Sequence, residues 1–369
     1  MRKLLIIILL IIMFSLMWIL GNQIYYLFEA KQMHEQEKGQ IQQNENKIQE
    51  IIEPKQVEIF NGDTRPIAVM IDNVGDARPQ AGLNDAYIVY EIIVEGNLTR
   101  LMAVFKDVDL EKIGPIRSSR HYFLDYALEN DAIYVHFGWS PQAQSDIRKL
   151  GVDNINGMAE SSSSFWRVRD KAAPHNAVTS TDKILKIAKR KKYDKTSDKE
   201  SVLNYVTDEV ELDSQIIATD ITIPYSYSYK VTYKYDEQTK RYTRGYNKVI
   251  QKDWDTKELV TTKNIIITFA KNYTLSDGTN KGRQNLSNIG TLDGYYITNG
   301  KAIKIKCEKT SRKAQTIYKD LDGNEIDVND GNTFIQIVPI NARVKIEPGK
   351  VKTQENLVNN IIENKAVIN

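Results

Sequence analysis

Two glutamates and an arginine on a predicted β-hairpin are the first candidates for chemistry in this sequence. If the hairpin turns at Gly96-Asn97, then Glu91, Glu95 and Arg100 lie on one face of it. The other residues on that face are apolar, so the charges should either pair with one another or face a cleft. The pattern leaves both readings open: a structural ion network, and a cleft floor used by a ligand or a reaction.

Two further arginines follow the hairpin in the stretch IGPIRSSRHYF, residues 113–123. A Gly-Pro turn precedes Arg117 and Arg120, and a helix-like apolar run follows them, so we expect both at a helix start. Cations there oppose the helix dipole unless an anion is near, and arginine suits carboxylate or phosphate. The expected partner is either a carboxylate of the protein (Glu91, Glu95 or Asp125) or an anionic ligand.

The histidines offer a second set of candidates. His136 closes a predicted strand, and His175 lies in the loop KAAPHNAV. Polar loop residues near a sheet end often bind or react, although each could be an ordinary hydrogen-bonded histidine. The candidate catalytic residues are therefore Glu91, Glu95, His136 and His175. The predicted ligand contacts are Arg100, Arg117, Ser118, Arg120, Asp72, Asn73 and Asn176.

Familiar catalytic motifs do not occur in the sequence. There is no Gly-x-Ser-x-Gly, no phosphate-binding Gly-x-x-x-x-Gly-Lys-Ser/Thr and no His-Glu-x-x-His. Cys307 is the one cysteine and reads as a structural strand residue. Tyr225, Tyr227 and Tyr229 are expected on one strand face, more as strand formers than as a glycan-binding stack. We expect no metal and no cofactor.

Composition narrows the class of protein. The 369 residues include 50 Lys+Arg and 48 Asp+Glu, for a net charge of +2. Nucleic-acid binding, which usually needs a strongly basic domain, is not expected. A single cysteine excludes an intramolecular disulfide.

The N-terminus predicts attachment to a membrane. Arg2 and Lys3 precede the uncharged apolar stretch 4–20, and 24–28 extends it. The stretch is long for a signal peptide and lacks an Ala-x-Ala cleavage pattern, so an uncleaved anchor is favoured over a cleaved signal. The positive flank places the N-terminal end in the cytoplasm. We therefore expect a single-pass protein of the cell membrane with extracytoplasmic domains.

The rest of the chain divides into segments by composition and hydrophobic pattern. Residues 31–62 read as a polar stem, for which a helix is one option, and the stem stops at Pro54. Strands are expected at 65–73, 86–96, 98–108 and 131–139, with helices at 118–130, 140–151 and 179–192. Later strands are expected within 225–246, 263–270, 294–309, 316–328 and 332–340. The predicted fold is an α/β N-terminal domain, a mixed sheet with helices, followed by an all-β antiparallel C-terminal domain. The predicted boundaries are 1–30 for the anchor, 31–62 for the stem, 63–205 and 215–348 for the two domains and 349–369 for the tail.

Several long strings resemble the YerB-like family of bacterial proteins. They are RPIAVMIDN, ARPQAGLNDAYIVYEIIVEGNLTRLMAVF, GPIRSSRHYFLDYA, YVHFGWSPQA and KAAPHNAVTS, then RYTRG, KNIIITF and DGNEIDVNDGNTFIQIVP. The resemblance covers about residues 64–340 and implies a two-part domain of unknown function found in proteins classed as lipoproteins. No cysteine follows the apolar segment, so lipidation there is excluded and anchoring falls to the helix itself.

These observations lead to three hypotheses. The first is an envelope protein that binds an anionic component, such as a phosphate-bearing lipid carrier or polymer, in a charged cleft. The second is an envelope hydrolase or transferase that uses Glu91 or Glu95 with Arg100, Arg117 and Arg120. The third is a non-catalytic scaffold for membrane-protein partners.

Overall fold

The computed structural model describes residues 2–52, 56–197 and 199–349, with helix side chains described for residues 10–42 of the first range. Contacts divide the chain into a unit that ends at Gln56 and a unit that begins at Val57. Each is described by itself. The predicted stop at Pro54 and nearly all of the predicted tail lie outside the described residues.

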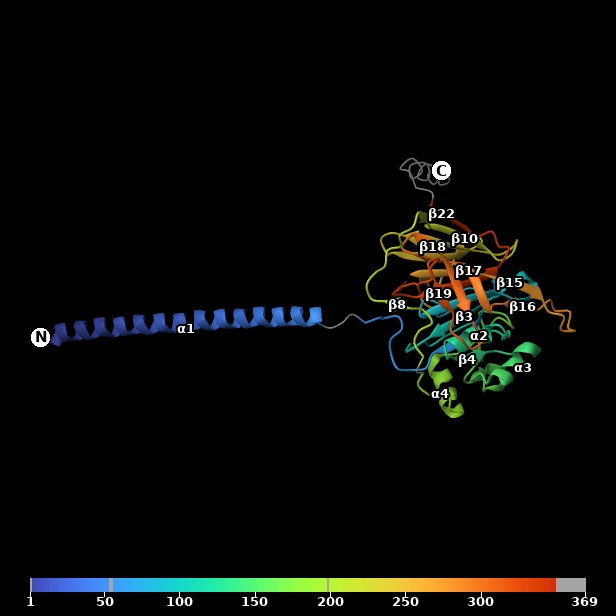
Figure 1. The fold of residues 1–369 in the computed structure, drawn as a ribbon. Coiled ribbons are helices and arrows are strands. Elements are labelled where there is room, and N and C mark those ends of the chain that lie inside the picture. The colour runs from blue at the N-terminus through green and yellow to red at the C-terminus, as the bar shows by residue number, and fades with distance from the viewer. Residues whose placement is uncertain (1, 53–55, 198, 350–369) are drawn as a thin grey trace, which may run out of the picture. The chain divides into compact units, whose positions relative to one another are not determined.

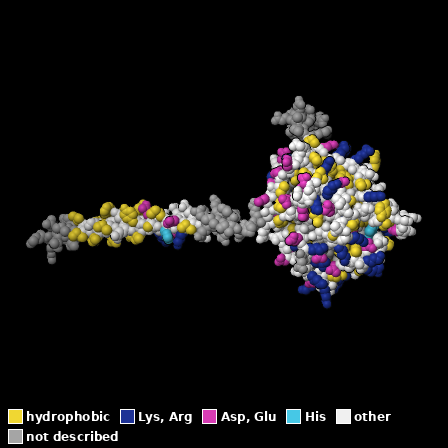
Figure 2. All heavy atoms as spheres, in the orientation of Figure 1, with side chains coloured by type: hydrophobic (Ala, Val, Ile, Leu, Met, Phe, Trp, Pro, Cys, Tyr) yellow, Lys and Arg dark blue, Asp and Glu magenta, His cyan; other side chains and the backbone are white. Residues whose placement is uncertain are grey.

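The first unit is one long helix, α1 (Arg2–Ile52), in which the apolar segment and the stem are continuous. Within Leu10–Gln42 a stretch with a mean hydropathy of 1.6 is long and apolar enough to cross a membrane, and none of it is buried. Figure 2 shows the apolar side chains along this helix. An N-terminal signal sequence would have the same properties, so the helix is a candidate span by length and composition.

The second unit begins with alternating strands and helices (Figure 1). Its first elements are β1 (Ile67–Asp72), β2 (Ile88–Ile93), β3 (Thr99–Phe105), α2 (Phe123–Glu129), β4 (Ile133–His136), α3 (Pro141–Leu150), β5 (Asn154–Asn156), β6 (Trp166–Arg167), β7 (Ala177–Val178) and α4 (Thr181–Lys191).

Strands alone make up the remainder. They are β8 (Tyr205–Val206), β9 (Ile216–Ile217), β10 (Asp220–Pro224), β11 (Lys230–Asp236), β12 (Arg241–Tyr246), β13 (Val249–Ile250), β14 (Thr261–Thr262), β15 (Asn264–Thr274), β16 (Gln284–Ser287), β17 (Gly290–Thr298), β18 (Lys301–Lys309), β19 (Ile317–Lys319), β20 (Val328–Asn329), β21 (Thr333–Pro339) and β22 (Lys345–Glu347).

Both halves contribute to one large mixed sheet of 12 strands. Its main order is β19-β18-β17-β15-β21-β2-β3-β1-β4-β5. Strand β21 lies between β15 and β2 and runs parallel to both, whereas most other C-terminal pairs are antiparallel. The predicted fold class, an α/β half followed by mainly antiparallel strands, is confirmed. The predicted boundaries stay a prediction.

A second sheet covers part of one face of the large one. It has the order β13-β12-β11-β10-β22, with β14 paired to β12. Its inward residues, such as Ile221 and Val231, share a core with Val89 and Leu101 of the hairpin, and helix α4 joins this core through Ile184. Helices α2 and α3 pack against the opposite face.

Helix ends are well specified by the sequence. The Ser140 hydroxyl accepts a hydrogen bond from Ala143 N, Pro141 follows it, and Gly151 ends α3 in the left-handed conformation. Helix α4 is capped in the same way by Ser180.

The helix predicted over 118–130 is wrong at its start, because α2 begins at Phe123. The residues before it make extended bridges, Ile71 to Ile116 and Ser119 to Trp139. The prediction that Tyr225, Tyr227 and Tyr229 share one strand face is also wrong: Tyr225 and Tyr229 are buried on either side of the exposed Tyr227, in the turn between β10 and β11.

Candidate functional site

The register of the β2–β3 hairpin decides which charges can meet. Glu91 faces Leu101 and Ile92 faces Arg100. The loop has three residues, Glu95–Asn97, and Val94 N donates to Leu98 O at 2.7 Å. The loop is one residue longer than the two-residue turn that the sequence predicts. A one-residue shift in register moves the side chains of one strand to the other face of the sheet. Glu91 and Arg100 therefore lie on opposite faces, and the prediction that they share one is wrong.

Glu91 lies on the face covered by the second sheet, in what we call the closed cluster: Glu91, Arg244, Tyr229 and Asn73. The Nη2 atom of Arg244, on β12, lies 2.6 Å from Oε2 of Glu91, and both side chains are 0% exposed. Tyr229 OH donates to Oε1 at 2.9 Å and Asn73 Nδ2 donates to it at 3.0 Å. The carboxylate is fully occupied by protein donors.

The closed cluster also joins the two halves of the unit. Burial alone would lower the pKa of Arg244, but the adjacent Glu91 carboxylate raises it well above its usual value. The other side of the guanidinium donates to Gln251, which donates to Gln80 at 2.8 Å. Within this guanidinium, the buried Nε has no hydrogen-bond partner among the atoms described. A fully buried charge pair of this kind holds two sheets in register rather than meeting a solute.

Glu95 lies at the tip of the hairpin and bridges two arginines. Arg120 donates to it through both Nε, at 2.8 Å, and Nη2, and Arg100 Nη2 lies 3.3 Å from Oε1. Burial alone would raise the pKa of Glu95, but the two guanidinium groups outweigh burial and lower the pKa to about 2. Burial and the nearby Arg120 lower the pKa of Arg100 to about 10. Of the two alternatives for Arg120, a protein carboxylate or a ligand, the structure has the carboxylate of Glu95.

An extended segment, not a helix, positions the remaining arginine. Arg117 N donates to Met70 O at 2.9 Å, and Phe137 N donates to Arg117 O at 3.0 Å, so the segment lies between the ends of β1 and β4. Gly114 has φ +143°, and a side chain there would approach Ala177 O to 3.1 Å. The close packing at Gly114 therefore holds the segment that follows it in an extended conformation.

Arg117, Asp72 and His175 form what we call the open cluster. Oδ2 of Asp72, at the end of β1, lies 2.7 Å from Nδ1 of His175 and 3.2 Å from Nε of Arg117. The Asp72 side chain is 1% exposed, whereas those of His175 and Arg117 are 18% and 24% exposed. Within the part of the chain that the structure describes, the Arg117 guanidinium makes this ion pair but no hydrogen bond, and His175 Nε2 has no hydrogen-bond partner.

The loop that carries His175 is fixed at its base and along its length. Asn176 accepts from Arg167 at 2.6 Å and donates to two loop carbonyls. Trp254, from the C-terminal half, donates its ring N–H to Asp170 at 3.0 Å, and the Lys171 ammonium lies 4.3 Å from its ring centre. Asn176, a predicted ligand contact, thus braces the loop.

Two other predicted site residues have structural partners. His136 is fully buried, with Nδ1 at 2.8 Å from Gly138 O and Nε2 at 3.2 Å from Asn154 Oδ1, and burial lowers its pKa to about 4. Ser118 donates its hydroxyl to Phe137 O at 3.0 Å. His136 therefore stays neutral inside the sheet and apart from the open cluster.

The structure thus separates the residues that the sequence grouped together. Asp72, Arg117 and His175 meet at one sheet edge, next to the Arg100–Glu95–Arg120 bridge. Glu91 and Asn73 lie on the other face, in the closed cluster. Sequence reasoning missed Arg244 and Trp254. In the sequence, Arg244 is only the second arginine of RYTRG, and Trp254 is a single tryptophan between two aspartates. Neither pattern indicates a partner.

No group of three or more His, Cys, Asp or Glu side chains that could hold a metal ion occurs among the described residues. The open cluster has one carboxylate and one imidazole beside a guanidinium, a donor set that suits an anion better than a cation.

Comparisons with known proteins agree with this architecture. Residues 55–194 match the N-terminal domain of a family described as "Protein of unknown function (DUF3048)", and residues 221–335 match its C-terminal domain. The chain is 31% identical over 291 residues to a Bacillus subtilis (strain 168) protein named "Putative lipoprotein YerB", which covers 78% of this chain and 85% of that protein. It also resembles the crystal structure of the YerB protein from Bacillus subtilis, with a TM-score of 0.68, 32% identity and coverage of 77% of this chain and 94% of that one. The chain therefore belongs to the two-part DUF3048 family to which YerB is related, a family without an assigned activity.

Proposed function

We propose that this protein is anchored to the cell membrane by α1 and binds an anionic component of the cell envelope at the open cluster. The location rests on the apolar helix and on the relative's name as a lipoprotein. The second unit is then extracytoplasmic. A phosphate-bearing lipid carrier or polymer is the ligand class that best suits a guanidinium.

The observation that carries the proposal is the charge balance at this sheet edge. Arg100, Arg117 and Arg120 give three positive charges, and Asp72 and Glu95 give two negative ones, which leaves one positive charge in excess. Glu95 is shared by Arg100 and Arg120 and can balance only one of them, and Asp72 pairs with Arg117, so the excess charge belongs to the whole group rather than to Arg117 alone. Arg117 is the most exposed of the three, with 24% of its side chain exposed against 7% for Arg100 and for Arg120, so it is the guanidinium that an anionic ligand can reach.

The geometry argues against Glu91 as the base of an envelope enzyme, because four protein donors already hold its carboxylate. Glu95 is equally engaged by two guanidinium groups. The scaffold hypothesis has no particular surface in its favour and becomes an outcome of the binding test.

The test compares two arginine variants in the full chain, held in phosphatidylcholine nanodiscs. Arg117→Ala removes the proposed anion contact, and Arg343→Ala removes the same charge from an exposed position before β22. The probe is poly(glycerol phosphate), with neutral dextran as the comparison ligand, and binding is measured by calorimetry. We expect Arg117→Ala to weaken binding at least about tenfold and Arg343→Ala to leave it within about twofold. Equal effects of the two variants, or no binding to the wild type, would favour a scaffold.

A further inference from the structure

The open cluster holds a histidine whose geometry goes beyond binding. We propose that Asp72 and His175 form a proton-transfer pair that cleaves a phosphodiester held by Arg117. This inference rests on the proposed function, because Arg117 must first hold the anion. It replaces Glu91 and Glu95 as the reactive groups with a pair that sequence reasoning never connected.

The hydrogen bond between the two residues fixes the histidine tautomer. Asp72 is buried, Arg117 Nε lies 3.2 Å from its Oδ2, and a carboxylate paired with a guanidinium only accepts hydrogen bonds. Nδ1 of His175, 2.7 Å away, must therefore carry the proton. In the neutral imidazole Nε2 is then unprotonated, and it has no other partner among the described residues. A proton acceptor thus stands beside a guanidinium at a partly exposed edge.

Each member of the pair is held in place by backbone contacts. Asp72 N donates to Pro115 O at 2.8 Å, and the Asp72 carbonyl accepts from the Gln80 side chain at 3.0 Å. His175 N donates to Ala172 O at 2.9 Å, and Trp254 holds the same loop from the other half of the unit. A surface histidine that only needed solvation would not require this support, whereas a proton-transfer residue depends on such positioning.

Water is the nucleophile that this arrangement supports. The Ser118 hydroxyl, next to Arg117, is already committed to Phe137 O. The water oxygen forms a bond to phosphorus while one of its protons passes to His175 Nε2. The phosphorus–oxygen bond to the departing alkoxide breaks, and that alkoxide takes the proton back from Nε2. The products are a phosphomonoester and an alcohol, the imidazole ends neutral, and Arg117 stabilises the charge on the phosphoryl oxygens.

The experiment measures turnover and binding on the same preparations of the full chain in phosphatidylcholine nanodiscs. Turnover is followed as 4-nitrophenolate released from bis(4-nitrophenyl) phosphate, and as new phosphomonoester from poly(glycerol phosphate) by phosphorus NMR, both with EDTA present. We expect His175→Gln to lower kcat at least about 100-fold and to leave poly(glycerol phosphate) binding within about threefold. The control Arg343→Ala should match the wild type in both assays.

Two further variants separate a chemical role from a structural one. Asp72→Asn should lower kcat at least about tenfold while binding stays equal or tightens, because the carboxylate no longer competes for Arg117. Turnover by His175→Ala should recover in added imidazole, which a merely structural histidine would not allow. Turnover that survives His175→Ala would overturn the inference, and so would a wild type that releases no product from either probe. If such a wild type still binds poly(glycerol phosphate) through Arg117, the proposed function stands alone. If product forms through His175 without measurable polymer binding, the binding proposal fails instead.

Discussion

The closed and open clusters contain neighbouring residues of the chain, Asn73 and Asp72, but the first cluster is buried and the second is partly exposed. Asn73 points to the face covered by the second sheet and joins Glu91 and Arg244, whereas Asp72 joins Arg117 and His175 at the sheet edge. In the closed cluster neither charge reaches solvent. In the open cluster the carboxylate is buried but both of its partners are partly exposed.

The difference shows what makes an ion pair available for function. Glu91 is covered because β12 and the turn before β11 bring Arg244 and Tyr229 over the hairpin. Asp72 has only a loop above it, so its partners keep hydrogen-bonding capacity. Charge alone does not mark a site. A site needs a charge whose partners are not all supplied by the protein.

The largest expected effect breaks the closed cluster. Glu91→Gln leaves the Arg244 charge buried without its counter-ion and should lower the free energy of unfolding by about 3–5 kcal/mol. Urea unfolding of the full chain in detergent, followed by tryptophan fluorescence, measures the loss.

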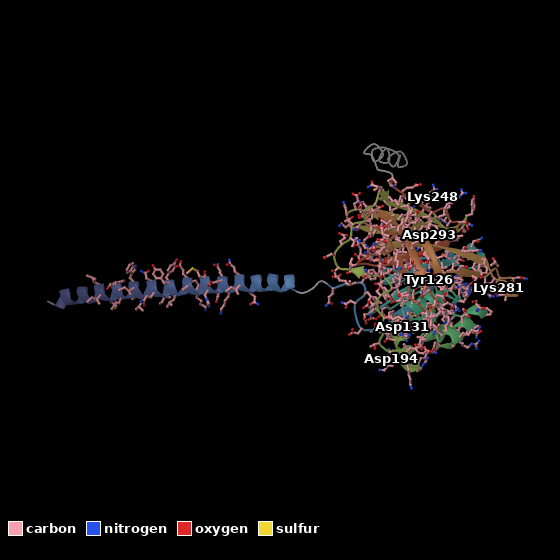
Figure 3. All side chains as sticks on the ribbon, in the orientation of Figure 1. Tyr126, Asp131, Asp194, Lys248, Lys281 and Asp293 are labelled. Carbon is pink, nitrogen blue, oxygen red and sulfur yellow. The ribbon has the colours of Figure 1, made fainter. Side chains whose placement is uncertain are left out.

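A surface pair with the same N–O distance is the matched control. Lys306 Nζ and Asp293 Oδ1 are 2.6 Å apart, but the two side chains are 44% and 76% exposed; Figure 3 labels Asp293. Asp293→Asn should change stability by less than about 0.5 kcal/mol. The double variant Glu91→Gln/Arg244→Leu should be more stable than Glu91→Gln alone, since no unpaired charge remains. Equal losses for Glu91→Gln and Asp293→Asn would mean that burial does not set the cost.

Much of the fold could be predicted from the sequence, because local chemistry specifies it. The strand β1 is a continuous apolar run, and α3 has a Ser-Pro start and a glycine end. Strand β21 was also expected, but its place between β2 and β15 was not. That place depends on pairing residues more than two hundred positions apart, and no local pattern contains it.

The candidate site was harder to predict, for a specific physical reason. Hairpin faces depend on loop length, and one extra loop residue, Glu95, put Glu91 and Arg100 on opposite sides. The partner of Glu91, Arg244, lies 153 residues away. The candidates Asp72, Arg117 and His175 were each named from the sequence, but their meeting at one oxygen needed the structure.

The next effect concerns a buried histidine. His136 is buried and has a pKa of about 4 in the folded protein, against 6.5 as its ordinary value. The unfolded chain therefore binds a proton below about pH 6.5 that the folded chain refuses until about pH 4, so stability falls as the pH drops through this window. The total loss is about 3 kcal/mol.

Unfolding measured from pH 7 to pH 4 in wild type and in His136→Asn checks this. The difference between the two curves should decrease toward low pH, because the variant lacks the titrating group. A curve for His136→Asn that stays parallel to the wild type would contradict the burial argument.

The third effect concerns the Arg100–Glu95–Arg120 bridge beside the open cluster. Glu95 has a pKa of about 2, below its ordinary 4.5, so it stabilises the folded state above about pH 4.5 and loses that contribution as the pH falls toward 2. Glu95→Gln should cost about 2 kcal/mol at pH 7, less than the shift alone implies because the carboxylate is a quarter exposed. The cost should shrink when unfolding is measured at pH 3, and a cost that is the same at both pH values would exclude the ion pairs as its source.

The smallest effect on stability should belong to the residue with the largest effect on binding. Arg117→Ala removes the ion pair with Asp72, and His175 keeps its place on the same oxygen. The guanidinium is partly solvated in the folded protein, so its loss should lower the free energy of unfolding by only about 1 kcal/mol. Thermal unfolding and poly(glycerol phosphate) binding, measured on the same sample, give the two numbers to compare. A large loss of stability with unchanged binding would mean that Arg117 has a structural role like that of Arg244 in the closed cluster. A small loss of stability with at least tenfold weaker binding would show that this guanidinium is held for a partner outside the protein.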